Sequence, residues 1–332
     1  MIMTKELSDK IRIGTFVCTV LVVWRHAMNL RAFDLTSDNG SLAFFIEHGI
    51  SKQTEIAVPF FFLVSGFFFF RYTYYGKNEY FRMISKKWHT LFVPFLFWNV
   101  VGIVPLLTTH KFVYEEEWWR YGVQLLHSDW SGILWYVRDI MTMMLLVPLY
   151  GWIFAVNSKW LYAAVGLYLF YNWLPVDCGW VSREGMLFFF LGGVLQKYSS
   201  VLTLKMPKYL LVVMLVAWMI SCFGFPFYWP IHRYNTLLGV LIGWQLLDYF
   251  PQKWRSPLLK VCPLSFFVYV VHANILGIMK VSLARSFSFN EAVALSAFFV
   301  LPFVTVFIAL GVGAVWKKYS SKTFGIVTGG RA

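Results

Sequence analysis

Two side chains suited to chemistry, Arg25 and His26, stand next to each other in the stretch VVWRHAMN, directly after ten residues apolar enough to lie in a membrane. A charge at the centre of a bilayer costs about 2.5–3.5 kcal/mol per residue even on lenient insertion scales. An imidazole exchanges protons near neutral pH, and a guanidinium attracts negative charge. We therefore predict that this end of the helix faces a reaction chamber.

Three further polar residues lie at a similar depth on other predicted helices. With a rise of about 1.5 Å per residue, His26 lies roughly 22 Å above the inner edge of its helix, and Ser65 lies near the midplane. Arg138 lies roughly 10 Å below the outer edge of its helix, and His272 roughly 15 Å above the inner edge. Polar residues from four helices in one slab favour a lined cavity. For each histidine, a structural role in the core is the alternative.

The composition indicates that membrane helices position these residues. Only 14% of the 332 residues are charged, whereas 59% are hydrophobic and 20% are aromatic. A soluble domain has about 25% charged residues, so this chain could not cover itself with polar surface. Runs such as FFFLVSGFFFF at 60–70 belong in lipid or inside a helix bundle. We predict an all-α polytopic membrane protein, with a single domain over 1–332, in the inner or plasma membrane of the cell.

About ten apolar segments are long enough to be transmembrane helices. With both termini in the cytoplasm, the inner connections hold more than twice as many Lys and Arg residues as the outer ones, which supports this orientation. The same asymmetry explains the net charge of +13 without a nucleic-acid partner. The predicted spans are 11–30, 55–73, 88–107, 131–154, 159–175, 184–198, 208–226, 234–250, 262–280 and 291–316.

One outer connection is predicted to form a short surface helix. The segment 115–127 reads EEEWWRYGVQLLH, with three glutamates in its first turn, where they suit the helix dipole. Trp118 and Trp119 suit the membrane interface. We therefore predict an amphipathic helix on the outer surface.

Five motifs follow one another along most of the chain. VLVVWRHA ends the first predicted helix, FFFLVSGFFF lies in the second, and FRMISKKWHTLFVPFLFW runs from a basic connection into a helix that contains proline. GILWYVRDI follows in the fourth helix, and LSFFVYVVHANIL lies near the end. In this order the chain resembles the acyltransferase 3 family of membrane proteins. Members carry acyl groups, most often acetyl, from cytoplasmic acyl-coenzyme A to hydroxyls of cell-surface sugars and related acceptors.

The resemblance implies catalytic roles for His26, Arg25 and Arg138. A sugar hydroxyl is a poor nucleophile until a base takes its proton, and we expect His26 to be that base. A carbonyl under attack develops negative charge, which Arg138 or Arg25 would stabilise. Two alternatives stay open, namely a purely structural His26 and an Arg138 that pairs with Asp139 and serves only in packing.

The resemblance also implies acyl-coenzyme A, most often acetyl-coenzyme A, as the donor substrate, with no permanently bound cofactor. His and carboxylate residues do not occur at metal-binding spacing, so we expect no metal. The phosphates of the donor should bind cations on the inner side of the membrane. The positive-inside pattern of membrane proteins is the alternative explanation of these charges. The usual family arginine, eleven positions before the histidine, is replaced here by Thr15, but fourteen positions before it Arg12 faces roughly the same way. The candidate donor-binding residues are Arg12, Arg71, Arg82, Lys86 and Lys87.

Ser65, Trp135, Tyr269 and His272 are the candidate substrate-binding residues. Ser65 could act as a nucleophile, but no activating base is adjacent to it in the sequence. The neighbouring Gly66 is explained more simply by the close approach of a helix or ligand. Trp135 is either a binding platform or an interfacial anchor. Tyr269 and His272 lie one turn apart, and they either orient a substrate or bond each other in the core. The expected partners are acyl-coenzyme A, membrane lipid and an extracytoplasmic sugar or glycolipid.

A secondary transporter or a lipid or glycolipid flippase is the alternative function, because such proteins also bury ionisable residues along a pathway. Transporters often contain inverted repeats, and we find no internal symmetry. A scaffold or regulatory membrane subunit would leave the buried Arg25 and Arg138 unexplained. The order of the motifs favours an O-acetyltransferase-like enzyme.

Overall fold

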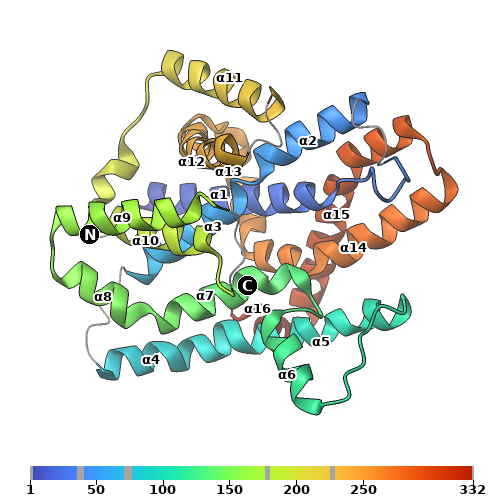
Figure 1. The fold of residues 1–332 in the computed structure, drawn as a ribbon, viewed down its shortest axis with the longest axis horizontal. Helices are drawn as coiled ribbons and strands as arrows, with labels where there is room; N and C mark the ends of the chain where they lie inside the picture. Colours follow the sequence, from blue (N-terminus) through green and yellow to red (C-terminus); the bar gives the residue numbers. More distant parts are fainter. Residues whose placement is uncertain (1–2, 36–40, 71–76, 176–179, 225–228, 331–332) are drawn as a thin grey trace. The chain divides into compact units, whose positions relative to one another are not determined.

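The computed structural model describes residues 3–35, 41–70, 77–175, 180–224 and 229–330, and these residues form helices joined by short connections (Figure 1). No strand occurs within these ranges, which confirms the all-α class. Each predicted span overlaps a helix or a pair of helices. These are α1 (Lys5–His26), α3 (Ala57–Phe69), α5 (Val93–Thr108), α7 (Trp135–Leu145) with α8 (Val147–Ala155), α9 (Lys159–Trp173), α10 (Arg183–Lys197), α11 (Lys208–Gly224), α12 (Trp229–Leu246), α14 (Ser265–Ser286) and α15 (Glu291–Tyr319).

Further helices lie between these segments. A π-helical turn at Trp88–Phe92 joins α4 to α5, so that a continuous helical stretch runs from Asn78 to Thr108. The outer segment predicted at 115–127 forms a helix that begins later, at Trp118, and its three glutamates precede the helix. The additional helices are α2 (Leu42–Thr54), α4 (Lys77–Lys87), α6 (Trp118–His127), α13 (Gln252–Val261) and α16 (Ser321–Thr328).

Three helical stretches among the described residues are long and apolar enough to cross a membrane, namely Asn78–Thr108, Gln252–Ser286 and Glu291–Tyr319. The pair α7 and α8, bent by 55°, would be a fourth. In α1, six of the 22 residues are charged. The 13 residues of α3 span about 20 Å, less than the ~30 Å of a hydrocarbon core. The number of ten spans and the orientation of the termini therefore stay predictions.

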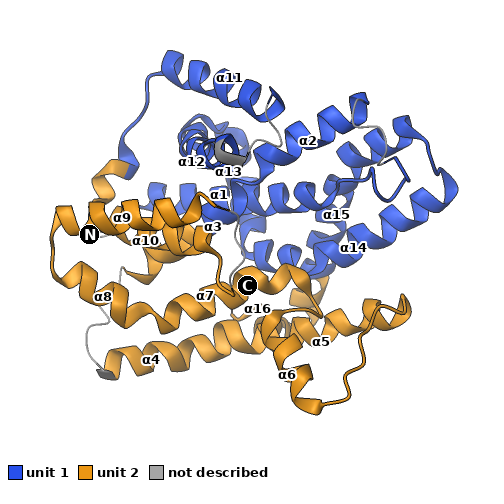
Figure 2. Ribbon diagram, viewed as in Figure 1, with its two compact units in different colours: residues 1–61, 202–314 blue, residues 62–201, 315–332 orange. Residues whose placement is uncertain are grey.

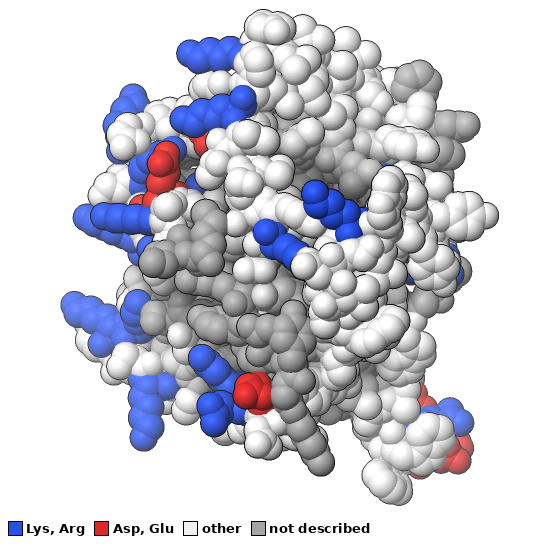
Figure 3. Space-filling model, turned by 90° about the vertical axis from the view of Figure 1, so that its left-hand side faces the viewer, with Lys and Arg blue, Asp and Glu red and all other residues white. Residues whose placement is uncertain are grey.

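The chain packs into two compact units (Figure 2). Unit 1 comprises Met1–Phe61 and Leu202–Ala314, and unit 2 comprises Phe62–Val201 and Val315–Ala332. The single domain over 1–332 stays a prediction. On the face drawn in Figure 3, most side chains are uncharged, and the charged ones are mainly Lys and Arg, as the composition requires.

In unit 1, α1 packs against α14, α2 and α13, and α11 packs against α2 and α12 (Figure 1). Thr4 caps the start of α1 through a hydrogen bond from the backbone N–H of Leu7 to its hydroxyl. Buried apolar side chains from α1, α14 and α15 pack together in one cluster, which includes Val23, Val268 and Ala309. This packing holds the C-terminal end of α1 against α14.

In unit 2, α10 packs against α9 and α7, and α16 packs against α5. The backbones of α3 and α10 approach closely at Gly66, where an added Cβ would lie 2.0 Å from the carbonyl oxygen of Phe189. The same holds at Gly192, where a Cβ would lie 2.1 Å from the carbonyl oxygen of Leu63. Only glycine allows this crossing, so the glycine beside Ser65 serves helix packing.

Candidate active site

His26 ends α1 next to His272 of α14. Their ring centroids lie 5.1 Å apart. His272 is fully buried, and its Nδ1 lies 2.5 Å from the carbonyl oxygen of Tyr269. Because a carbonyl oxygen only accepts, Nδ1 carries the hydrogen and Nε2 keeps a lone pair, which has no hydrogen-bond partner among the described residues. The His26 side chain is exposed. Two of the four polar residues predicted at one depth are therefore neighbours, and His272 bonds the backbone of Tyr269 rather than its phenol.

The backbone that follows His26 is held from two sides. The Nζ of Lys280 donates to the carbonyl oxygen of His26 at 3.1 Å and to that of Met28. The carboxylate of Glu47, on α2, accepts a hydrogen bond from the backbone N–H of Asn29 at 2.8 Å. The last carbonyl groups of a helix lack partners within the helix, and a cation satisfies them well. Lys280 and Glu47 therefore fix the position of the chain at His26.

The sequence analysis did not single out either of these residues. Lys280 counted only as an outer-side charge, and Glu47 lies in a helix that was not predicted. The available signal was an acid between the apolar residues of LAFFIEHGI, because an acid that is buried needs a partner. Its partners are the backbone N–H groups of Asn29 and Leu30, in the connection that follows α1.

The burial of Glu47 should make the stability of the folded protein depend on pH. Burial raises the pKa of Glu47 to about 7 from a reference value of 4.5, although backbone N–H groups oppose the shift. A folded-state pKa above the unfolded value means that the fold loses stability as the pH rises through this interval, by up to about 3 kcal/mol. We expect the melting temperature of the wild type to fall between about pH 5 and 8, and that of Glu47→Gln to depend less on pH. Equal pH slopes in thermal unfolding of the two proteins would contradict this.

Arg25 belongs to a cluster of charges around Glu55, directly after α2. Its Nη2 lies 3.4 Å from Oε1 of Glu55, and the Nζ of Lys52 lies 3.2 Å from the same oxygen. The Nε2 of His232, on α12, lies 3.0 Å from Oε2. Two permanent cations share one carboxylate, so this group keeps a net positive charge. Arg25 is therefore oriented by Glu55 without being neutralised within the group, as stabilisation of a developing oxyanion requires.

Glu55 and His232 are functional candidates that the sequence analysis missed. Glu55 is a single acid at the start of the apolar run EIAVPFFF, which was a usable signal. His232 lies in WPIHRYN, beside an arginine, and nothing in the sequence connects it to Glu55. Their contact depends on the packing of α12 near the end of α2.

Arg138 pairs with Asp139 on α7. Its Nη2 lies 2.9 Å from Oδ1 of Asp139, and its Nη1 donates to the carbonyl oxygen of His127 at 3.0 Å. Asp139 is fully buried and also accepts a hydrogen bond from the backbone N–H of Ser182 at 2.8 Å. The ion pair that the sequence left open as an alternative is therefore present. A catalytic role for Arg138 stays a prediction.

Ser65 and Trp135 contact neighbouring aromatic residues in unit 2. The Oγ of Ser65 lies 3.0 Å from the hydroxyl of Tyr136, either of which is able to donate. The ring centroid of Trp135 lies 6.2 Å from that of Phe62. Tyr136 was not singled out in the sequence, although it stands in GILWYVRDI beside Trp135. The hydroxyl of Ser65 is thus oriented by a phenol.

The cations proposed to bind the donor lie in both units. Arg71 falls outside the described residues. On α4, Arg82 and Lys86 are exposed and lie four residues apart, and Lys87 lies 5.8 Å from the ring centroid of Phe69. All of these belong to unit 2.

Arg12 belongs to unit 1 and is exposed. Its Nη2 donates to the carbonyl oxygen of Leu259 at 3.3 Å, and its Nη1 lies 3.9 Å from Asp9. Unit 1 also holds Arg25, His26, Tyr269 and His272, whereas unit 2 holds Ser65, Trp135 and Arg138. The convergence of all candidate residues on one chamber stays a prediction.

No group of three or more His, Cys, Asp or Glu side chains is arranged to hold a metal ion in the part of the chain that the structure describes. In the comparison with protein families, a family model described as an acyltransferase domain matches residues 14–316. Comparison with curated proteins gives no match, and comparison with solved structures gives none either.

Proposed function

Because the chain belongs to the acyltransferase 3 family, we propose that this membrane protein transfers an acyl group, most simply acetyl, from cytoplasmic acyl-coenzyme A to a hydroxyl on the outer side of the membrane. The acceptor is a cell-surface carbohydrate or a related glycolipid. The proposal includes ten spans in the inner or plasma membrane, with both termini in the cytoplasm.

The observation that carries the proposal is the setting of His26 at the end of α1. Its backbone is held by Lys280, the residue is exposed, and its ring lies beside the imidazole of His272. A fixed backbone and an accessible imidazole are what a general base needs, because proton transfer requires hydrogen-bond reach of the hydroxyl.

In the proposed reaction, His26 takes the proton of the acceptor hydroxyl while the hydroxyl oxygen attacks the thioester carbonyl. The carbon–oxygen bond forms, the carbon–sulfur bond breaks, and the proton held by His26 passes to the departing coenzyme A sulfur. The products are an ester and a free thiol, so protons and electrons balance. Arg25, oriented by Glu55, stabilises the negative charge on the carbonyl oxygen.

Mass analysis of surface glycans tests the proposal. Glycans from a host with the gene should contain components heavier by one acyl unit than those from a host without it. That result would also identify the acyl group. A changed distribution of lipid between leaflets without new esters would instead support a transporter or flippase.

The donor is proposed to dock on the cations of α4. Replacing Lys86 and Lys87 together by Glu should weaken acetyl-coenzyme A binding in detergent by at least about 10-fold, because two attractions to phosphate become repulsions. The matched control is Lys317→Glu with Lys318→Glu, an exposed lysine pair at the end of α15. Equal losses in both double variants would reflect net charge alone. If the Lys86 and Lys87 double variant binds acetyl-coenzyme A as tightly as the wild type, these lysines set the membrane orientation and do not bind the donor.

A further inference from the structure

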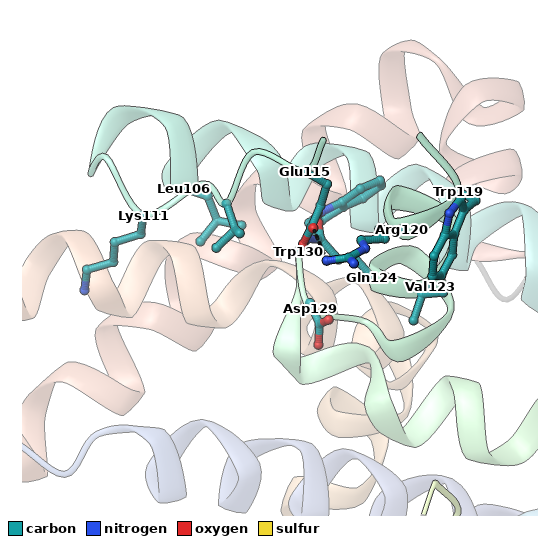
Figure 4. Close-up of a pocket in the computed structure, with 10 residues that line it drawn as sticks. Leu106, Lys111, Glu115, Trp119, Arg120, Val123, Gln124, Asp129 and Trp130 are labelled. Carbon is teal, nitrogen blue, oxygen red and sulfur yellow. Dashed lines mark hydrogen bonds and ion pairs between the residues drawn. The ribbon is translucent and has the colours of Figure 1, made fainter. Parts of the chain in front are cut away.

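Unit 2 contains an open pocket of about 520 Å³ that is lined by the end of α5, by α6 and by the connections on either side of α6 (Figure 4). This volume lies in the range of small-molecule sites. Trp119 and Val123 of α6 form one side, whereas Glu115, Gln124 and Trp130 lie together in the middle. None of these residues has a part in the acyl transfer proposed above.

The polar side chains of the pocket are ordered by one another. The amide of Gln124 donates to Oε1 of Glu115 at 2.7 Å, and the indole N–H of Trp130 donates to the amide oxygen of Gln124 at 2.8 Å. Arg120 reaches the other carboxylate oxygen of Glu115 at 3.5 Å. The Gln124 amide has a second hydrogen to donate, and the Glu115 carboxylate has further lone pairs that accept. Such a pre-arranged set of planar groups suits hydroxyl ligands, which both donate and accept.

The charges of the pocket compensate one another. Arg120 is bound to Glu115 and also to Glu117, whose Oε2 lies 3.1 Å from its Nε. The lining holds the two cations Lys111 and Arg120 and the two acids Glu115 and Asp129. Figure 4 shows Lys111 well apart from the central group. A phosphate or another anion would find no net positive charge here, so the pocket favours an uncharged ligand.

An aromatic wall completes the pocket. Trp119 is 51% exposed and lines the opening together with Val123. An indole offers a large flat apolar face with little loss of side-chain entropy. A ligand that presents an apolar C–H face to the indole and hydroxyls to Glu115 and Gln124 would satisfy both halves of the lining. A pyranose ring has this two-sided character.

We propose that this pocket binds a neutral sugar ring of a glycan. The chain segment that follows α6 connects the pocket to Arg138. Asp129 of the lining lies 2.6 Å from Nδ1 of His127, and the carbonyl oxygen of His127 accepts the hydrogen bond from Arg138. As a site that retains the acceptor, the pocket deepens the proposed function and rests on it, whereas sugar binding itself does not depend on catalysis.

Saturation-transfer NMR on the full chain in a sugar-free detergent tests the proposal. The probes are neutral gluco-, galacto- and manno-oligosaccharides and N-acetylglucosamine. At least one should receive saturation, and Trp119→Ala should weaken that binding by about 10-fold. The matched control is Trp118→Ala, on the same helix, because Trp118 is 83% exposed and is not in the lining. Trp118→Ala and His26→Gln should both bind like the wild type.

Three results would overturn the proposal. The first is the absence of saturation transfer to every sugar of the panel. The second is an equal loss in Trp118→Ala and Trp119→Ala, which would indicate contact with detergent rather than with a pocket. The third is displacement of the bound sugar by inorganic phosphate. Sugar binding that persists in His26→Gln, together with no acyl transfer by the wild type, would separate failure of the proposed function from failure of this site.

Discussion

The variant His26→Gln should lose acyl transfer by a factor of about 10²–10⁴, the usual contribution of a positioned general base. Glutamine has a similar reach and keeps hydrogen-bonding capacity, but it does not take up a proton at neutral pH. The contacts of Lys280 are to backbone carbonyl oxygens, so they survive the substitution. The fold at the end of α1 should therefore persist while the chemistry stops.

The measurement is the rate of ester formation by protein at matched level and melting temperature. The control is His110→Asn. His110 is exposed and lies in the predicted outer connection between the spans 88–107 and 131–154. Its φ of 55° is a conformation that asparagine tolerates well. This control should keep its activity. Wild-type rates in His26→Gln would leave His26 with a structural role, which is the alternative that the sequence allows.

The variant Arg138→Ala should destabilise unit 2 by about 3–5 kcal/mol, because it removes the cation that pairs with the buried carboxylate of Asp139. Adding Asp139→Asn removes the buried charge and keeps an acceptor for the Ser182 N–H. The double variant should therefore regain most of the lost stability. Thermal unfolding in detergent measures both effects.

The same pair of variants distinguishes packing from catalysis at Arg138. If Arg138 stabilises the oxyanion, the stable double variant should still transfer acyl groups about 10²-fold more slowly than the wild type. If activity returns together with stability, Arg138 serves only to hold Asp139 and the backbone at His127. A single variant does not separate these outcomes, because an unfolded protein is inactive in either case.

Much of the helical layout follows from hydropathy alone. Apolar runs near 20 residues long predict helices at the positions where the structure has them, and α6 was expected from its amphipathic pattern, although it begins at Trp118 rather than at Glu115. The helix α2 was missed, because its 13 residues mix apolar and polar types and are too few to cross a membrane. The bend between α7 and α8 was missed as well, although Pro148 stands at the start of α8.

The candidate site was less accessible from the sequence. Arg138 and Asp139 are adjacent in the chain, so their pairing was foreseeable as an alternative. Lys280 and His26 are 254 positions apart, and Glu55 and His232 are 177 positions apart. A hydropathy pattern identifies which segments are buried, but it does not tell which face of a helix meets which neighbour.

The sequence by itself determined the all-helical class and the membrane family. It also identified the stretch VVWRHA and the basic residues of α4 as functional candidates. Composition, motif order and local periodicity can all be read along the chain without knowledge of the packing. Only the tertiary structure decided that His26 lies against His272, that Lys280 and Glu47 hold the backbone beside it, and that Glu55 gathers Arg25, Lys52 and His232. These contacts arise from the rotation and packing of helices that are distant in the chain, and side-chain hydrogen bonds of about 3 Å are set by that packing rather than by any local pattern.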